Sequence, residues 1–417
     1  MSNFFKDSLK KMSDLNLIDF SKFSQRGIEK ESLRVNNSNI STSDHPEILG
    51  AALTNPYITT DFSEALLELI TAKAFSVEKA LSDLKIILAY THQNIDDTVW
   101  PGSIPCAIKE ESDIRIAHYG NSNSGRIKEL YRIGLSYRYG SMMQCVSGIH
   151  YNFSLSENFF RKWKGSASEF QTFQDKKYLN LIRNFRKNAW LLLYLFGASP
   201  VVPKTFLTNR NNFLKPLNDE DLYLENATCL RMSELGYMSK AQDDLNIAYN
   251  DLDEYISDLK HALTKKHEPY EKIGLKKGDK HIQINDSIIQ IENEYYSSIR
   301  PKRVVQSGQR PINVLKNKGI EYIEVRCLDN NPFLRGSIDK HTAYFIEAYL
   351  MVSLIDENYP FDKNRIKEIQ DNWQNTVRKG RDPSLLLKRD GKTISVKDAA
   401  EEVFSKIYDY AYTLPLE

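Results

Sequence analysis

Two glutamates at alternate positions of one predicted strand constrain this chain more than any other feature. Residues 26–35, RGIEKESLRV, alternate in character and predict a β-strand. Successive side chains on a strand point to opposite faces, so Glu29 and Glu31 share one face. Neighbouring carboxylates repel each other unless a cation lies between them, and Mg²⁺ prefers such oxygen ligands. Taken alone, the segment is more typical of a solvated strand face with mixed charge.

Three more carboxylates follow in the sequence TTDFSEALLE, at Asp61, Glu64 and Glu68. The β-branched and aromatic residues 57–62 predict a strand, whereas residues 65–71, ALLELIT, fit either a strand or a helix. In a helix, Glu64 and Glu68 would share one wet face at i,i+4 spacing. In a strand, Glu68 would be a charge inside an apolar segment and would need a partner.

Two further predicted strands carry polar pairs at the same period of two. In GIHYNF, residues 148–153, His150 and Asn152 share one face and the apolar residues share the other. The split directs His150 toward a polar environment, although a single histidine is more often structural. In GIEYIEVRCL, Glu324 and Arg326 share a face, which by itself indicates a simple ion pair.

A basic cluster, RPKR at residues 300–303, suits phosphate because arginine binds phosphate bidentately. A charged surface turn has the same composition. The sequence contains neither a Walker A pattern nor a GxGxxG motif after a strand. We therefore expect any bound triphosphate to be held by carboxylate-bound Mg²⁺ ions and scattered basic side chains.

Long helical segments separate these strands. Helices are predicted over residues 1–20, 76–99, 156–196, 241–265, 338–356, 361–379 and 396–412, with another ending at Tyr139 and a further strand over 281–291. The absence of regular βαβ alternation argues against a doubly wound parallel sheet. The pattern predicts an α+β enzyme with an antiparallel sheet, whose converging strands would gather the carboxylates into a multi-metal ATP site.

Composition excludes several classes of protein. The formal net charge is +1, from 56 basic and 55 acidic residues, which argues against nucleic-acid or membrane-surface partners. The longest apolar run, residues 189–196, is too short to span a bilayer, and the charged N-terminus has no signal-peptide core. The four cysteines form no CxxC pair, so we expect reduced, mostly buried thiols in a cytoplasmic protein.

Six segments together are similar to the motifs of proteobacterial-type glutamate–cysteine ligases: QRGIEKESLRV, ITTDFSEALLELIT, SGIHYNFSL, LRMSELGY, IQIENEYYSSIRPKR and GIEYIEVRCLDNNPF. The resemblance implies a glutamine synthetase-like fold, with a curved antiparallel sheet of about six strands forming a funnel surrounded by helices. It implies one catalytic ligase domain over residues 1–417 with helical insertions, and no ATP-grasp domain. The implied reaction joins the γ-carboxylate of glutamate to the amine of cysteine through γ-glutamyl phosphate, with ATP as co-substrate.

The resemblance also implies a set of site residues. The metal ligands would be Glu29, Glu31, Asp61, Glu68, His150 and Glu324, holding about two or three Mg²⁺ ions, with Mn²⁺ as an alternative. The substrate-binding residues would be Phe62, Tyr131, Arg132, Leu135, Gln144, Arg231, Tyr237 and Tyr296, with Arg231 on the cysteine carboxylate. Phosphate would meet Arg300, Lys302 and Arg326. Arg326 and Glu29 would act in catalysis, and Cys145 would take no part.

The similarity fades after Arg378–Pro383, where we expect the family's helical tail to be missing or shortened. Two alternatives follow. The chain could activate glutamate for a different amine acceptor, or it could be a non-catalytic binding relative. The intact carboxylate set argues against the second, because carboxylates that repel each other would be lost without a metal. A monomer is the expected state, with an oligomer left open.

Overall fold

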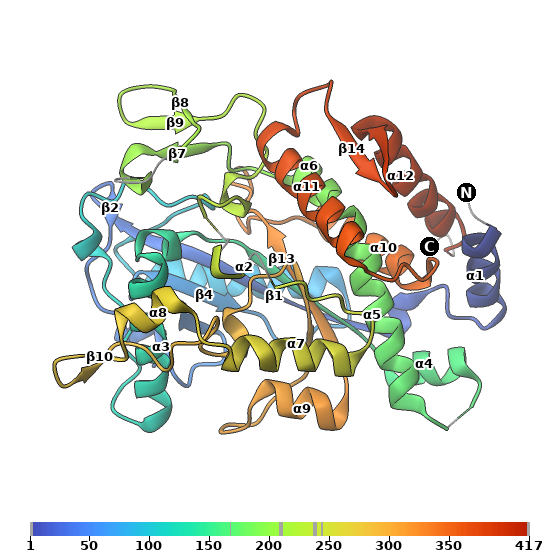
Figure 1. Cartoon of the computed structure of the whole chain (residues 1–417), viewed down its shortest axis with the longest axis horizontal. Helices are drawn as coiled ribbons and strands as arrows, with labels where there is room; N and C mark the ends of the chain where they lie inside the picture. Colours follow the sequence, from blue (N-terminus) through green and yellow to red (C-terminus); the bar gives the residue numbers. More distant parts are fainter. Residues whose placement is uncertain (1–2, 167, 208–211, 237–239, 243–244, 415–417) are drawn as a thin grey trace.

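The computed structural model describes residues 3–166, 168–207, 212–236, 240–242 and 245–414, and it centres on one antiparallel sheet (Figure 1). The sheet path runs β12–β13–β6–β1–β4–β3, and β2 and β5 also pair with β1. The bounds are β1 Ser24–Asn36, β2 Asn39–Ile40, β3 Ile58–Thr60, β4 Leu66–Ile70, β5 Thr98–Val99, β6 Ile149–Leu155, β12 Ile299–Lys302 and β13 Tyr322–Leu328. The predicted α+β class with an antiparallel sheet is confirmed.

Twelve helices lie in the described part of the chain: α1 Asn3–Asp14, α2 Val77–Asn94, α3 Asn123–Tyr139, α4 Glu157–Lys164, α5 Phe170–Asn188, α6 Trp190–Phe196, α7 Leu252–Thr264, α8 Glu268–Ile273, α9 Pro311–Lys318, α10 Lys340–Ile355, α11 Lys363–Lys379 and α12 Val396–Tyr412. Short strands complete the chain: β7 Val201–Pro203, β8 Lys215–Pro216, β9 Asp221–Tyr223, β10 Lys276–Lys277, β11 Lys280–His281, β14 Leu386–Arg389 and β15 Lys392–Ser395. None of the helices described is long and apolar enough to span a membrane.

The two faces of the sheet differ in chemistry. Helix α2 packs against β1 and β4, α5 against β12, and α6 against β13, while α10 packs against α5. On this face the strands bury apolar side chains in the main core, among them Ile28, Leu67, Leu69, Ile149, Tyr151, Phe153 and Val325. Because side chains alternate along a strand, the intervening positions carry their polar groups to the opposite face. That face holds the candidate site.

The structure settles the open choice between strand and helix for ALLELIT. Leu66–Ile70 form β4, so Glu64 and Glu68 do not share a helix face. Pairing with β1 decides this, because it satisfies the backbone and buries Leu67 and Leu69. Glu64 instead accepts backbone N–H groups from His45 and His118, each at 2.6 Å.

The strand predicted over 281–291 is wrong. Lys280–His281 forms a two-residue strand paired with β10, and Ser287 forms one isolated bridge with Lys266. An Asn285 side chain that accepts from the Ser287 N–H at 3.0 Å turns the chain there, and Arg138 donates to the carbonyl oxygens of both residues. The predicted helix over 241–265 begins only at Leu252, after its N-cap Asp251. The helix predicted over 156–196 is three helices, α4 to α6.

Candidate active site

A cavity of about 330 Å³ lies over the polar face of the sheet. Strands β1, β4, β6, β12 and β13 supply one wall, and helix α3 with the loops around residues 143–146 and 284–296 supplies the rest. Its lining includes Glu29, Glu31, Asp61, Glu68, Tyr131, Arg132, Gln144, His150, Tyr296, Arg300, Lys302, Glu324 and Arg326. All six predicted metal ligands and all three predicted phosphate-binding residues therefore meet in one cavity.

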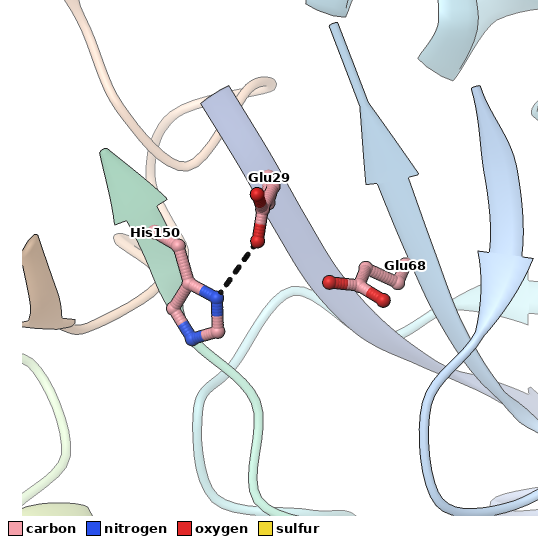
Figure 2. A group of neighbouring side chains, drawn as sticks. All are labelled: Glu29, Glu68 and His150. Carbon is pink, nitrogen blue, oxygen red and sulfur yellow. Dashed lines mark hydrogen bonds and ion pairs between the residues drawn. The ribbon is translucent and has the colours of Figure 1, made fainter. Parts of the chain in front are cut away.

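Strand register brings the carboxylates together. Glu29 lies directly opposite His150 in the β1–β6 pair, and Glu31 lies opposite Glu68 in the β1–β4 pair. The His150 ring lies between the two β1 glutamates, with Nδ1 at 3.1 Å from Glu29 Oε2 and Nε2 at 3.4 Å from Glu31 Oε1. Figure 2 shows Glu29 and His150 in contact, with the Glu68 carboxylate facing them across β1. Asn152 donates to Glu29 Oε1 at 2.8 Å.

Basic partners offset the charge of some carboxylates in the cavity but not of others. Burial opposes ionisation of Glu324, yet Arg326 and Lys302 hold the pKa of that carboxyl well below its usual range. Burial likewise opposes ionisation of Glu29, but the hydrogen bond from His150 lowers its pKa. On the other side, burial raises the pKa of Glu68 far above its usual value, and the nearby Glu29 and Asp61 add to the effect.

The same imbalance reaches Glu31, whose pKa is raised chiefly by burial and further by Asp61. Uncompensated carboxylates on one side of a cavity call for a cation, because buried charge is costly without a partner.

The donor set fits a divalent metal ion. One ligand atom from each of Glu29, Glu68 and His150 lies within 4.8 Å of the other two. Carboxylate oxygens are the preferred ligands of both Mg²⁺ and Mn²⁺, and the imidazole offers one nitrogen ligand beside them. Among the described residues, Glu324 Oε2 accepts no hydrogen bond although it is buried. Glu31, Asp61 and Glu324 line the same cavity outside this closest group.

A basic wall, formed by Arg326, Lys302 and Arg300, lies next to Glu324 in the cavity. Arg326 Nη1 lies 3.0 Å from Glu324 Oε1 and 3.4 Å from His150 Nδ1, and Lys302 Nζ lies 3.4 Å from Glu324 Oε2. Arg300 is buried, and its Nη2 donates to the carbonyl oxygens of Asn293, at 3.0 Å, and Tyr295. Arg326 and Lys302 therefore contact the Glu324 carboxylate, whereas Arg300 binds backbone carbonyl oxygens next to it.

The predicted substrate-binding residues divide into three groups. Tyr131, Arg132, Gln144 and Tyr296 line the cavity, and Gln144 Nε2 donates to the Tyr296 hydroxyl at 3.4 Å. Phe62 and Leu135 instead lie in a hydrophobic cluster that also contains Cys145 and contacts Tyr131. Burial also raises the pKa of the Cys145 thiol, which keeps it protonated. Tyr237 lies outside the described residues.

Arg231 forms the third group, because it lies behind the lining rather than in it. Its side chain is buried, and Nε donates to Asp329 Oδ1 at 2.9 Å while Nη2 donates to the Leu328 carbonyl oxygen at 2.8 Å. Its guanidinium lies against Gly148, whose N–H donates to Glu31 Oε2 at 2.9 Å. Gly148, in the loop that precedes β6, therefore separates Arg231 from Glu31.

Sequence reasoning assigned no role to two polar residues at the site. Asn152 donates to Glu29 and shares the strand face of His150, so the period of two that selected His150 applies equally to it. Lys128 lines the cavity one helical turn before Arg132 on α3, so helical spacing would have indicated it.

A second cavity, of about 170 Å³, opens at the other end of the same strands. Its lining includes Gln25, Gly27, Lys73, Asn152, Val304 and Tyr322. Asn152 lines this second cavity and donates to Glu29, which lines the first, so the two cavities are neighbours.

Comparison with known proteins gives a consistent picture. Residues 9–376 match the family model described as glutamate–cysteine ligase. The chain is 44% identical over 412 residues to a glutamate–cysteine ligase of Janthinobacterium sp., covering 98% of this chain and 78% of the relative. It is 45% identical over 395 residues to one of Pseudomonas entomophila, covering 94% and 74%.

Solved structures agree with these relatives. A crystal structure of a glutamate–cysteine ligase from Francisella tularensis in complex with AMP superposes with a TM-score of 0.89 at 43% identity, covering 94% of this chain and 79% of that one. A bifunctional glutathione synthetase from Pasteurella multocida gives a TM-score of 0.74 at 25% identity, covering 98% of this chain and 47% of that one.

Proposed function

The chain belongs to the glutamate–cysteine ligase family and catalyses the first step of glutathione synthesis, and from this premise we propose how its cavity does so. ATP would phosphorylate the γ-carboxylate of glutamate, and the amine of cysteine would displace phosphate from the resulting γ-glutamyl phosphate. The observation that supports this most is the group of Glu29, Glu68 and His150 beside the basic wall of Arg326 and Lys302. An anionic carboxylate and an anionic triphosphate can meet only where both charges are offset.

We propose that Glu29, Glu31, Asp61, Glu68, His150 and Glu324 hold about two or three Mg²⁺ or Mn²⁺ ions. When bound, such ions neutralise phosphate and carboxylate oxygens and bring them into line. His150 holds Glu29 in place from the opposing strand, and Asn152 fixes its other oxygen. These contacts set the ligand oxygens before any substrate arrives, which lowers the cost of reorganisation.

Arg326 would stabilise the transferring phosphoryl group. Its guanidinium already lies at 3.0 Å from Glu324, on the rim of the carboxylate group, so it can reach phosphate oxygens near the same ions. Lys302 and Arg300 extend this positive wall, with Lys302 the more mobile donor because Arg300 is bound to backbone carbonyls. No enzyme nucleophile is needed, since the acyl phosphate supplies the leaving group.

The nucleoside would occupy the second cavity. It adjoins Glu29 through Asn152 and offers Val304 and Tyr322 as apolar contacts of a kind that suits a base. A triphosphate extending from there would reach Glu29 from the side opposite to Tyr131. Glutamate and cysteine would then enter through the larger cavity, so the two reactants would approach the ions from different ends.

The amine substrate would contact Tyr131, Arg132, Gln144 and Tyr296, and its carboxylate would pair with Arg231. Arg132 is held by carbonyl oxygens of Asp61 and Lys128 and stacks over the Tyr119 ring at 4.6 Å, which directs it along the cavity. Phe62 and Leu135 would act from behind by supporting Tyr131. Tyr237 would complete the pocket.

We also infer the wider organisation. The sheet would curve into a glutamine synthetase-like funnel around the cavity, within one catalytic domain that spans the chain and acts as a cytoplasmic monomer. Sedimentation of the purified protein tests the monomer.

The reaction is tested by mass spectrometry of the product formed from ATP, glutamate and cysteine, against glutamate with alanine, glycine or cysteamine. We expect γ-glutamylcysteine and one ADP per bond formed. ADP release with glutamate and cysteine but without that dipeptide would overturn the mechanism. Equal turnover of alanine would overturn the proposed pocket while leaving the glutamate chemistry intact.

A further inference from the structure

We propose that Asp329 and Gly148 hold the guanidinium of Arg231 in the orientation that receives the carboxylate of the amine substrate. Both would be positioning residues of the ligase reaction, since they act through Arg231. The inference rests on the function proposed above, in which Arg231 anchors that carboxylate. Neither residue belongs to the predicted metal, phosphate or substrate-binding set.

Asp329 follows directly after β13, and its side chain is fully buried. Its Oδ1 accepts from Arg231 Nε at 2.9 Å and from Cys229 Sγ at 3.0 Å. Its Oδ2 accepts from Ser199 Oγ at 2.6 Å and from the Ala198 N–H at 2.8 Å. A carboxylate with four donors around it has one orientation, so it fixes the Nε edge of the guanidinium.

The charge of Asp329 matters as much as its shape. Arg231 is buried, which by itself would lower the pKa of its guanidinium, but Asp329 raises that pKa above the usual value. A buried arginine keeps its place only when a counter-charge offsets the loss of water. Asp329 is the carboxylate that contacts it directly.

Gly148 packs against the flat face of the Arg231 guanidinium and restricts its position. A Cβ at this position would lie 2.8 Å from Arg231 Cζ and 2.9 Å from each terminal nitrogen, closer than side chains pack. Gly148 is therefore required here for space. Its N–H donates to Glu31 Oε2, so the peptide that supports the guanidinium also borders the carboxylate group.

These two contacts predict a specific defect. If the orientation of Arg231 is lost, recognition of the substrate carboxylate weakens, while amine and thiol recognition and glutamate activation persist. Cysteamine separates these contributions, because it carries the amine and thiol of cysteine without the carboxylate. The measured quantity is the ratio of kcat/KM for cysteine to kcat/KM for cysteamine, at saturating glutamate and ATP.

We expect Asp329→Asn and Gly148→Ala each to lower this ratio by about tenfold, the usual effect of weakening a charge-assisted hydrogen bond. KM for glutamate and for ATP should stay within about twofold of the wild-type values. Asp371→Asn is the matched control, because its carboxylate pairs with Lys388 at the surface, and it should keep the wild-type ratio. If cysteamine turns over slowly, its competition against cysteine gives the same ratio.

The opposite outcome is equally defined. Equal losses with cysteine and cysteamine in folded variants would mean that Asp329 and Gly148 only support the structure, and would overturn the proposal. If Asp329→Asn does not fold, as judged by circular dichroism, Gly148→Ala decides, because it removes no hydrogen-bonding side chain and no charge. An unchanged ratio in Arg231→Ala would overturn the carboxylate anchor itself, whereas a fall there without a fall in Gly148→Ala would overturn only the positioning.

Discussion

Glu31 and Glu68 face each other across β1 and β4 at directly opposed positions, both inside the cavity. Like charges opposite each other destabilise a sheet, and burial strengthens the repulsion. We therefore expect Mg²⁺ or Mn²⁺ to raise the melting temperature of the purified protein, and EDTA to lower it again. Differential scanning calorimetry at constant ionic strength checks this.

Glu68→Gln sharpens that prediction. The neutral side chain should stabilise the metal-free protein, because it removes a buried charge, and should reduce the increase in melting temperature that Mg²⁺ produces. A surface control, Asp371→Asn, should retain the full increase. A Glu68→Gln protein with the wild-type response to Mg²⁺ would contradict the assignment of this carboxylate as a ligand.

The pH dependence of stability follows from the same carboxyl. The pKa of Glu68 is raised in the folded protein, so it binds a proton there over a range in which the unfolded chain has lost it. Below the usual glutamate value of 4.5 the group adds no penalty. As the pH rises from there through the raised pKa, the metal-free protein loses stability. Chemical unfolding in EDTA should show this loss in the wild type and a smaller one in Glu68→Gln.

Glu29→Gln should abolish ligation without unfolding the protein. The amide keeps the size of the side chain and can still contact His150 and Asn152, but it no longer offers a charged ligand to the ions. We expect kcat to fall by about 10³-fold or more, the scale of losing an electrostatic catalytic group. Steady-state turnover and circular dichroism measure both parts. Full activity would exclude Glu29 from the metal site.

Cys145→Ala should remain active. The thiol is buried in the cluster with Phe62 and Leu135, and burial raises its pKa, so it is not a nucleophile. Removing the sulfur leaves a small void, and we expect a loss of about 1 kcal/mol in the free energy of unfolding with kcat unchanged. Urea denaturation and turnover test the two separately. A folded but inactive variant would bring back a covalent mechanism.

Glu347→Gln tests the support beneath the site. Glu347 on α10 pairs with Arg26 of β1 at 2.7 and 2.9 Å and accepts from the Tyr151 hydroxyl of β6 at 2.6 Å, all on the core face. Removing one charge from a buried pair costs about 3–5 kcal/mol. We expect a clear drop in the urea midpoint. Asp83→Asn, which breaks the exposed pair with Lys79, should change the midpoint little, and equal midpoints in both variants would contradict the role of Glu347.

Much of the site could be predicted because strand geometry is local. The period of two placed Glu29 with Glu31, His150 with Asn152, and Glu324 with Arg326 on shared faces. The structure brings five of these into one cavity, and Asn152 binds Glu29 from beside it. The resemblance to a known family supplied the reaction and the remaining ligands, and the comparisons confirm the family. These conclusions needed no knowledge of which strands are neighbours.

Other features depended on contacts between distant parts of the chain. Whether ALLELIT is a strand or a helix is decided by β1, which supplies its hydrogen-bond partners. The strand expected over 281–291 is lost where Arg138 of α3 binds the backbone of Asn285 and Ser287. Local sequence preferences are weak, and tertiary contacts override them where they are equivocal.

The sequence alone thus determined which side chains share a strand face, and through the family which chemistry they serve. Only the tertiary structure decided that Glu31 meets Glu68 and Glu29 meets His150, and that Arg231 is held by Asp329 behind the cavity lining. The physical reason is that alternation along a strand follows from backbone geometry within a few residues. Register and burial depend instead on how the whole sheet packs, so no single segment contains them.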